Sequence, residues 1–166
     1  MYDLTVSGLH TFYAVAGSSS PVLVHNCDNL ALDESQFPDA HTLAEPVKPN
    51  EQEAKALSEA KTRKLGKPTA NSVWIDEATA QKVLDFALDK NASRISKWMR
   101  TQGGPSELPL RGVFGPEGSS LGKVHWADRP TEEAGNHFFL KLVKAPKGRG
   151  IPKHPRGYYV QTFYPV

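Results

Sequence analysis

The chain has 166 residues, of which 39% are hydrophobic and 23% charged, and its formal net charge is +2. This composition fits one modest globular domain with a tail. The single cysteine excludes an internal disulfide framework and Cys-rich zinc sites. No apolar run approaches the roughly 20 residues needed to span a bilayer, and we expect no secretory signal peptide because a cationic leader is missing.

Short strands are predicted near the start, where "YDLTV", "HTFYAVA" and "VLVH" surround a "GSSSP" turn. Strands of this length cannot form a core alone. The last one runs into His25, Asn26 and Cys27. An asparagine amide can attack its own backbone carbonyl and cleave the bond that follows. A preceding histidine can supply a proton, and a following thiol can accept an acyl group. As a bare tripeptide, the same residues also fit an ordinary loop.

The whole segment is more specific than the tripeptide. Residues 2–27, "YDLTV…LHTFYAVAG…VLVHNC", resemble the C-terminal end of the intein-like Hint domains of bacterial polymorphic toxins. The resemblance implies cleavage after Asn26 and release of the part that follows. The front half of a Hint domain, with its first nucleophile, is not in this sequence, so we expect inefficient self-processing. Residues 1–26 are therefore predicted to be a Hint fragment and residues 27–40 a linker.

Two helices are expected in the middle of the chain. Residues 50–65, "NEQEAKALSEAKTRKL", have helix-forming composition, and Gly66 is a stop signal. A longer helix is predicted over residues 75–104, where apolar residues recur at helical spacing behind Asp76 as the N-cap.

After the helices, the apolar period changes to two, which predicts strands. They are expected at residues 108–115, 120–126, 137–145 and 157–165. Helices followed by strands indicate an α+β fold with an antiparallel sheet.

The last predicted strand carries two neighbouring hydroxyl groups. Thr162 and Tyr164 are two residues apart, about 6.5–7 Å along a strand, and simple alternation predicts that they share a face with Tyr158 and Val160. An ordinary polar strand face is the alternative interpretation.

Charge is unevenly spread along the chain. Residues 28–60 carry eight acids against two lysines, whereas residues 137–166 carry six basic residues and no acid. A basic stripe interleaved with aromatic residues can bind a phosphate backbone, and a solvated loop is the alternative. The candidate RNA-binding residues are Lys144, Lys147, Arg149, Lys153 and Arg156.

A second resemblance covers residues 41–166. The pieces "HTLAE", "SVWIDEATAQKV", "RISKWMR", "RGVFG", "AGNHFFLKLVK" and "GYYVQTFYP" occur in this order. They look like the RNase A-like toxin domains at the C-terminus of contact-dependent inhibition and related polymorphic toxins. The resemblance implies a kidney-shaped α+β fold without disulfides and a ribonuclease that uses no metal or cofactor. It also implies a cognate immunity protein, secretion within a larger toxin, and action in the cytoplasm of a competitor cell.

The implied reaction is transphosphorylation. A base removes the proton of the ribose 2′-hydroxyl, that oxygen attacks phosphorus, and an acid protonates the leaving 5′-oxygen. By the resemblance, Thr162 and Tyr164 match the family's Thr-x-Tyr and orient the phosphate, while Lys61 or, as second choice, Arg63 neutralises it. The 2′-hydroxyl makes RNA, and not DNA, the expected substrate.

The expected histidine is missing from its position. The family pattern resembles H-T-L-x-x-H-V, in which the second histidine is the acid/base. Here His41 is present, but Pro46 occupies the position of the second histidine. Proline cannot transfer a proton through its side chain. Three explanations are open: the chain is an inactivated copy, His41 takes the role of the missing histidine, or another histidine reaches the site. We expect reduced or absent activity, and surface positions for the remaining histidines, His125, His137 and His154.

Three functions compete at this stage. The first is an RNA-cleaving toxin, monomeric apart from its immunity complex and with no membrane contact. The second is a non-catalytic remnant that binds the immunity protein or RNA. The third is an ADP-ribosyltransferase, which would need a Gly-rich or Arg/Glu nucleotide pocket that does not stand out in this sequence. An immunity protein covering the basic C-terminal region is expected to be acidic there.

Overall fold

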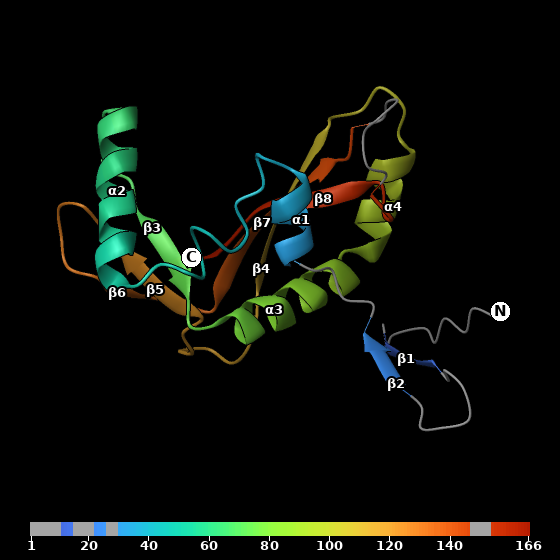
Figure 1. Cartoon of the computed structure of the whole chain (residues 1–166), viewed down its shortest axis with the longest axis horizontal. Helices are drawn as coiled ribbons and strands as arrows, with labels where there is room; N and C mark the ends of the chain where they lie inside the picture. Colours follow the sequence, from blue (N-terminus) through green and yellow to red (C-terminus); the bar gives the residue numbers. More distant parts are fainter. Residues whose placement is uncertain (1–10, 15–21, 26–29, 147–153) are drawn as a thin grey trace.

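The computed structural model describes residues 11–14, 22–25, 30–146 and 154–166 (Figure 1). Within them lie four helices, two three-stranded antiparallel sheets and a two-stranded hairpin, which confirms the α+β class. The hairpin pairs β1 (Thr11–Ala14) with β2 (Val22–His25), while the predicted strand "YDLTV" lies outside the described residues. None of the described helices has the length and apolar character to cross a membrane.

The segment predicted as a linker is folded where the structure describes it. Residues Leu30–Gln36 form helix α1, and Leu30 lies in the main hydrophobic core. Phe37 follows the helix, and its ring stacks on that of Tyr159 with 3.9 Å between centroids. The linker prediction is therefore wrong for residues 30–40. Their acidic composition suggested an exposed segment, but the apolar side chains of Leu30 and Phe37 are buried.

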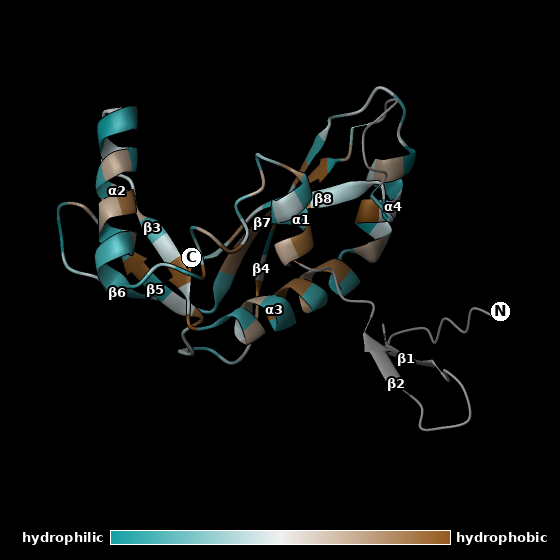
Figure 2. Ribbon diagram, in the orientation of Figure 1, coloured by the Kyte–Doolittle hydropathy of each residue, from teal (hydrophilic) through white to brown (hydrophobic). Residues whose placement is uncertain are grey.

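Helix α2 (Glu51–Leu65) has the predicted bounds. Asn50 and Glu53 form a capping box at its start, and Gly66 ends it in a left-handed conformation with φ of 67°. Its buried side chains are the small residues Ala54 and Ser58, and Figure 2 shows hydrophilic colour at both of its ends. Because so little apolar surface is buried, α2 contacts the rest of the fold along one edge.

The long helix predicted over residues 75–104 is two helices, α3 (Glu77–Lys90) and α4 (Ala92–Arg100). Asp76 caps α3 as predicted, since its carboxylate accepts the Thr79 N–H at 2.6 Å. The break falls at Asn91, whose side-chain amide donates to the carbonyl of Ala87 at 2.8 Å. An asparagine amide competes with the helix for backbone groups, which favours a helix end here.

The first sheet has the order β3-β5-β6, formed by β3 (Asn71–Trp74), β5 (Gly122–His125) and β6 (Glu132–Ala134). The sequence predicted β5, within a longer expected strand, whereas β3 and β6 were not predicted. Gly122 lies against β3 so closely that a Cβ atom there would collide with the carbonyl of Val73. Glycine is therefore needed for the close pairing of β3 and β5.

The second sheet has the order β4-β7-β8, formed by β4 (Glu107–Val113), β7 (His137–Lys144) and β8 (Tyr158–Pro165). All three strands were predicted. Leu142 pairs with Val160 and Lys141 with Thr162, so Gln161 is an extra, bulged residue. The bulge reverses the alternation: Val160 is buried in the core, and Thr162 lies on the opposite face. The prediction that Thr162 and Tyr164 share a face with Tyr158 and Val160 is therefore wrong.

Trp74 joins the two sheets. Its indole N–H donates to the carbonyl of Phe163 at 3.2 Å, and the two rings lie 4.5 Å apart. The core beside this contact is filled by α3, α4 and the inner faces of β4, β7 and β8. Figure 1 shows α2 beside β3 and β5, away from α3 and α4. The strand that carries Thr162 and Tyr164 thus ends next to the smaller sheet.

Candidate active site

Helix α1 holds the segment that contains His41. One carboxylate oxygen of Glu34 accepts the backbone N–H groups of Thr42, Leu43 and Ala44 at 3.2, 3.2 and 2.9 Å. The hydroxyl of Thr42, which is fully buried, donates to the carbonyl of Leu30 at 2.7 Å. Three donors on one carboxylate fix the backbone directly after His41.

The bulge of β8 holds the same segment from the other side. The N–H of His41 donates to the carbonyl of Gln161 at 2.7 Å, and His41 forms a bridge with Thr162. The carboxylate of Asp39 accepts the Tyr159 hydroxyl at 2.8 Å and the Gln161 amide at 2.6 Å. Burial opposes ionisation of Asp39, but these hydrogen bonds outweigh it and keep the pKa of its carboxyl below the ordinary value. Asp39 and the bulge together set His41 beside Thr162.

An open pocket of about 540 Å³ lies where β8 meets the smaller sheet. It is lined by side chains from five separate parts of the chain, including His41, Pro46, Lys61, Asn71, Thr162 and Tyr164. The candidate residues on the last strand, the candidate cation on α2 and the candidate histidine therefore share one cavity.

Lys61 is held in place by Glu45 and Asn71. Its ammonium lies 2.7 Å from a carboxylate oxygen of Glu45 and donates to the Asn71 side-chain oxygen, also at 2.7 Å. The amide of Asn71 in turn donates to the Glu45 carbonyl at 3.1 Å. The imidazole of His41 is 4.0 Å from the same carboxylate. Arg63 is exposed and is not among the side chains that line the pocket, so the structure brings Lys61, and not Arg63, to the other candidates.

Pro46 is buried and lines the same pocket. Its carbonyl accepts the N–H of Trp74 at 2.7 Å, and the turn around it is closed by a hydrogen bond from Val47 to the carbonyl of Leu43 at 3.0 Å. This turn folds the chain back on itself. As a result, the four residues between His41 and Pro46 do not prevent both from reaching the pocket.

Two aromatic residues complete the pocket wall. Burial raises the pKa of the Tyr164 phenol, although Arg111 nearby opposes the rise, so the phenol is a neutral hydrogen-bond donor at neutral pH. The indole N–H of Trp126 is buried, and no described group accepts its proton. The guanidinium of Arg129 lies 3.6 Å from the centre of the Trp126 ring. Each of these groups can donate to, or attract, an anion.

Sequence reasoning missed several residues of the site. Glu34, Glu45 and Asn71 come from segments far apart in the chain, and no local pattern marks them. Trp126 is the last residue of a predicted strand, and its proximity to the pocket depends on the pairing of β3 with β5. Only the fold could reveal these contacts.

The remaining histidines lie outside this pocket, and two of them are not at the surface as predicted. His125 and His154 are 3% and 4% exposed, whereas His137 is exposed. His154 Nε2 lies 3.0 Å from a carboxylate oxygen of Asp33, whose pKa burial raises to about 6. Burial also lowers the pKa of His125. Both buried imidazoles have hydrogen-bond partners within the fold, Asp33 for His154 and Thr131 for His125.

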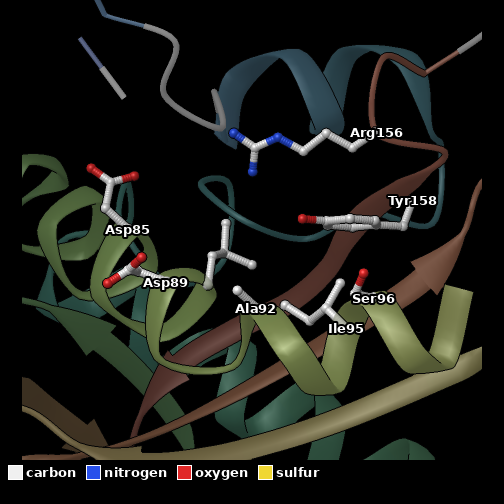
Figure 3. Close-up of a pocket in the computed structure, with 8 residues that line it drawn as sticks. Asp85, Asp89, Ala92, Ile95, Ser96, Arg156 and Tyr158 are labelled. Atoms are coloured by element: carbon white, nitrogen blue, oxygen red, sulfur yellow. The ribbon is translucent and has the colours of Figure 1, made fainter. Parts of the chain in front are cut away.

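The candidate RNA-binding residues that the structure describes lie away from the pocket. Lys144 pairs with Tyr158 at the start of β8, and its ammonium donates to the Thr101 carbonyl at 3.1 Å. Arg156 lines a second, smaller pocket between α3, α4 and β8 (Figure 3). Asp85 and Asp89 line it as well, and carboxylates disfavour a phosphate.

Several predicted residues cannot be placed. Lys147, Arg149 and Lys153 lie outside the described residues, as do Asn26 and Cys27. His25 is the last residue of β2.

One comparison with known proteins identifies a family, and another identifies a similar fold. Residues 40–165 match the family model described as bacterial CdiA-CT RNase A domain. The fold is similar to the crystal structure of a CdiA-CT/CdiI complex from Y. kristensenii 33638, with a TM-score of 0.53 and 16% sequence identity. That match covers 76% of this chain and 99% of the other. A search of curated protein sequences gave no significant match.

Proposed function

The chain belongs to the bacterial CdiA-CT RNase A domain family, and we propose that it is a toxin domain that cleaves RNA by transphosphorylation in the pocket at the end of β8. The observation that carries the proposal is the convergence of His41, Lys61, Thr162 and Tyr164 on one open cavity. These side chains supply an imidazole, a cation and two hydroxyls. No single segment of the chain supplies all of them.

Each group has a role in the proposed reaction. The His41 imidazole accepts the proton of the ribose 2′-hydroxyl, which allows that oxygen to attack phosphorus. The Lys61 ammonium offsets the charge that accumulates on the phosphorane, while the hydroxyls of Thr162 and Tyr164 donate hydrogen bonds to its oxygens. The His41 imidazolium then returns the proton to the departing 5′-oxygen, and a 2′,3′-cyclic phosphate remains.

We further propose that Pro46 limits the rate. The family resemblance places an imidazole at this position, and an efficient reaction needs both a base and an acid. A single imidazole at position 41 would have to serve in both roles. General acid or base catalysis contributes about 10²- to 10⁴-fold in rate. A pocket with one imidazole should therefore work slowly, which agrees with the expectation of reduced activity.

The remaining parts of the proposal concern context. We propose that His25, Asn26 and Cys27 belong to a Hint remnant whose complete form cleaves after Asn26. We also propose that an immunity protein binds this domain, because the similar protein of known structure is a CdiA-CT/CdiI complex. Delivery within a secreted toxin, and action on RNA in the cytoplasm of the target cell, follow from the same family.

Incubation of total RNA with the purified chain tests the proposed reaction. The Pro46→His variant should cleave faster than the wild type and yield fragments ending in cyclic phosphate. The change keeps the carbonyl of residue 46, which accepts the Trp74 N–H, and adds a backbone N–H that proline lacks. In that background, Tyr164→Phe and His41→Ala should each slow cleavage. His137→Ala is the matched control, because His137 is exposed and lies outside the pocket.

The outcome separates the two leading functions. Slow cleavage by the wild type that His41→Ala removes supports catalysis by His41. Intact RNA with the wild type, and cleavage restored by Pro46→His, identifies an inactivated copy, which would then act only by binding. Intact RNA with both proteins refutes the ribonuclease.

A further inference from the structure

The outer face of the second sheet carries a row of side chains that leads into the pocket. Arg111 on β4 pairs with Phe139 on β7, and Phe139 pairs with Tyr164 on β8. Residues directly opposite in antiparallel strands project from the same face. The three side chains therefore form a continuous line across the sheet, and its last member is a pocket residue.

The members of this row are in contact. The guanidinium carbon of Arg111 lies 4.9 Å from the centre of the Phe139 ring. The Phe139 and Tyr164 rings lie 5.2 Å apart with 39° between their planes. In the next row, Lys141 pairs with Thr162 and brings a second cation beside the pocket. The two rows together combine two aromatic rings with two basic side chains, of which Lys141 lies 3.8 Å from a carboxylate oxygen of Glu107.

Another part of the same face is covered by the protein itself. In the row of Val143 and Tyr159, the side chains pack against Phe37 and Ala40 from the segment after α1. Arg111, by contrast, is exposed, and Phe139 and Tyr164 are partly exposed. The open part of the sheet begins where the covering segment reaches His41 and the pocket.

We propose that Arg111, Phe139 and Tyr164 form a binding site for a nucleobase of single-stranded RNA, next to the phosphate held in the pocket. Unpaired bases stack on aromatic rings and on arginine guanidinium planes, which is how proteins commonly bind single-stranded RNA. Arg111 and Lys141 complement the negative backbone. The site rests on the proposed ribonuclease function and extends it, because it selects unpaired RNA and fixes one neighbour of the scissile phosphate.

In this proposal the RNA near the reaction runs along Arg111 and Phe139, and not past Lys144 and Arg156. Lys144 and Arg156 lie toward the start of β8, beside the second pocket, whereas Arg111 and Phe139 are aligned with Tyr164 itself. A nucleotide that occupies the pocket can reach the row without crossing the covered part of the sheet.

Binding of a 2′-O-methyl single-stranded oligonucleotide, measured by fluorescence anisotropy, tests the proposal without cleavage. Phe139→Leu should weaken binding about 5- to 30-fold, as expected for the loss of one stacked base. Arg111→Gln should also weaken it. Arg100→Gln, which removes an exposed arginine at the end of α4, is the matched control and should have a smaller effect. A duplex of the same sequence should bind the wild type and Phe139→Leu equally, because its bases are not available for stacking.

Two variants are used so that the test does not depend on the folding of either one. Phe139→Leu retains an apolar side chain, and if it fails to fold, the exposed Arg111 carries the test alone. Unchanged binding in both variants, or no binding by the wild type, overturns the proposal. Failure of the ribonuclease itself would appear separately, as intact unmodified RNA with both the wild type and Pro46→His while the anisotropy differences persist.

Discussion

Substitution of Asp39 by asparagine should loosen the segment that holds His41. The Asp39 carboxylate accepts hydrogen bonds from the Tyr159 hydroxyl at 2.8 Å and the Gln161 amide at 2.6 Å. Both donors bond to the same carboxylate oxygen, so an asparagine can keep both hydrogen bonds, but it removes the negative charge that strengthens them. The Gln161 carbonyl, which accepts the His41 N–H, belongs to the same bulge. The effect should therefore reach His41 without any change to its side chain.

The expected size follows from these contacts. A hydrogen bond to a charged group contributes about 1.5–3 kcal/mol. Asp39 is exposed, and water competes for its carboxylate. Asparagine also preserves both bonds in a weaker, neutral form. We therefore expect Asp39→Asn to lower the free energy of unfolding by about 1–2 kcal/mol.

Urea unfolding and amide hydrogen exchange measure the two parts of this prediction. The unfolding midpoint should fall with an unchanged slope, and the His41 N–H should exchange faster than in the wild type. Asp128→Asn is the matched control, because that exposed carboxylate lies 4.0 Å from Arg129. Its effect should stay below about 0.5 kcal/mol. Equal stability of the Asp39 and Asp128 variants, with unchanged exchange at His41, would refute the role assigned to Asp39.

Two further substitutions test the buried and catalytic parts of the fold. Asp33→Asn should lower stability by about 1–3 kcal/mol in urea unfolding, because Asp33 accepts from both the Val160 N–H and His154, and an amide leaves one buried donor unpaired. Equal stability of the variant and the wild type would show that these contacts contribute little. Glu45→Gln should tighten binding of the 2′-O-methyl oligonucleotide, because it removes the carboxylate that lies 2.7 Å from Lys61. Weaker binding would contradict the view that the Lys61 ammonium attracts the RNA phosphate.

Local sequence patterns predicted the regular elements well. The Gly66 stop of α2, the Asp76 cap and the strands that became β4, β5, β7 and β8 follow from short-range rules on capping and alternation. The errors occurred where one residue changes a long pattern. Asn91 splits a helix whose apolar spacing continues through it, and Gln161 shifts the alternation of β8 by one position. The Asn91 amide favours a helix end through its bond to the Ala87 carbonyl, but an isolated asparagine does not require one, and no local pattern marks the bulge at Gln161.

The candidate site divides in the same way. The family resemblance led to Thr162, Tyr164 and Lys61, but it could not choose between Lys61 and Arg63. That choice depends on which face of α2 meets the Glu45 turn, which is a long-range contact. The network around Asp39 was equally hidden, because Tyr159 and Gln161 lie about 120 positions farther along the chain.

The pocket depends on the contact between the two sheets. Thr162 and Tyr164 belong to the larger sheet, and Asn71 belongs to the smaller one. The N–H of Trp74 bonds to the carbonyl of Pro46, and its indole bonds to the carbonyl of Phe163. One tryptophan thus fixes the turn behind the pocket and the strand in front of it. Separation of the sheets would remove the cation and the imidazole position from the hydroxyls at once. The integrity of the proposed site should therefore follow the stability of this junction, and not that of any single strand or helix.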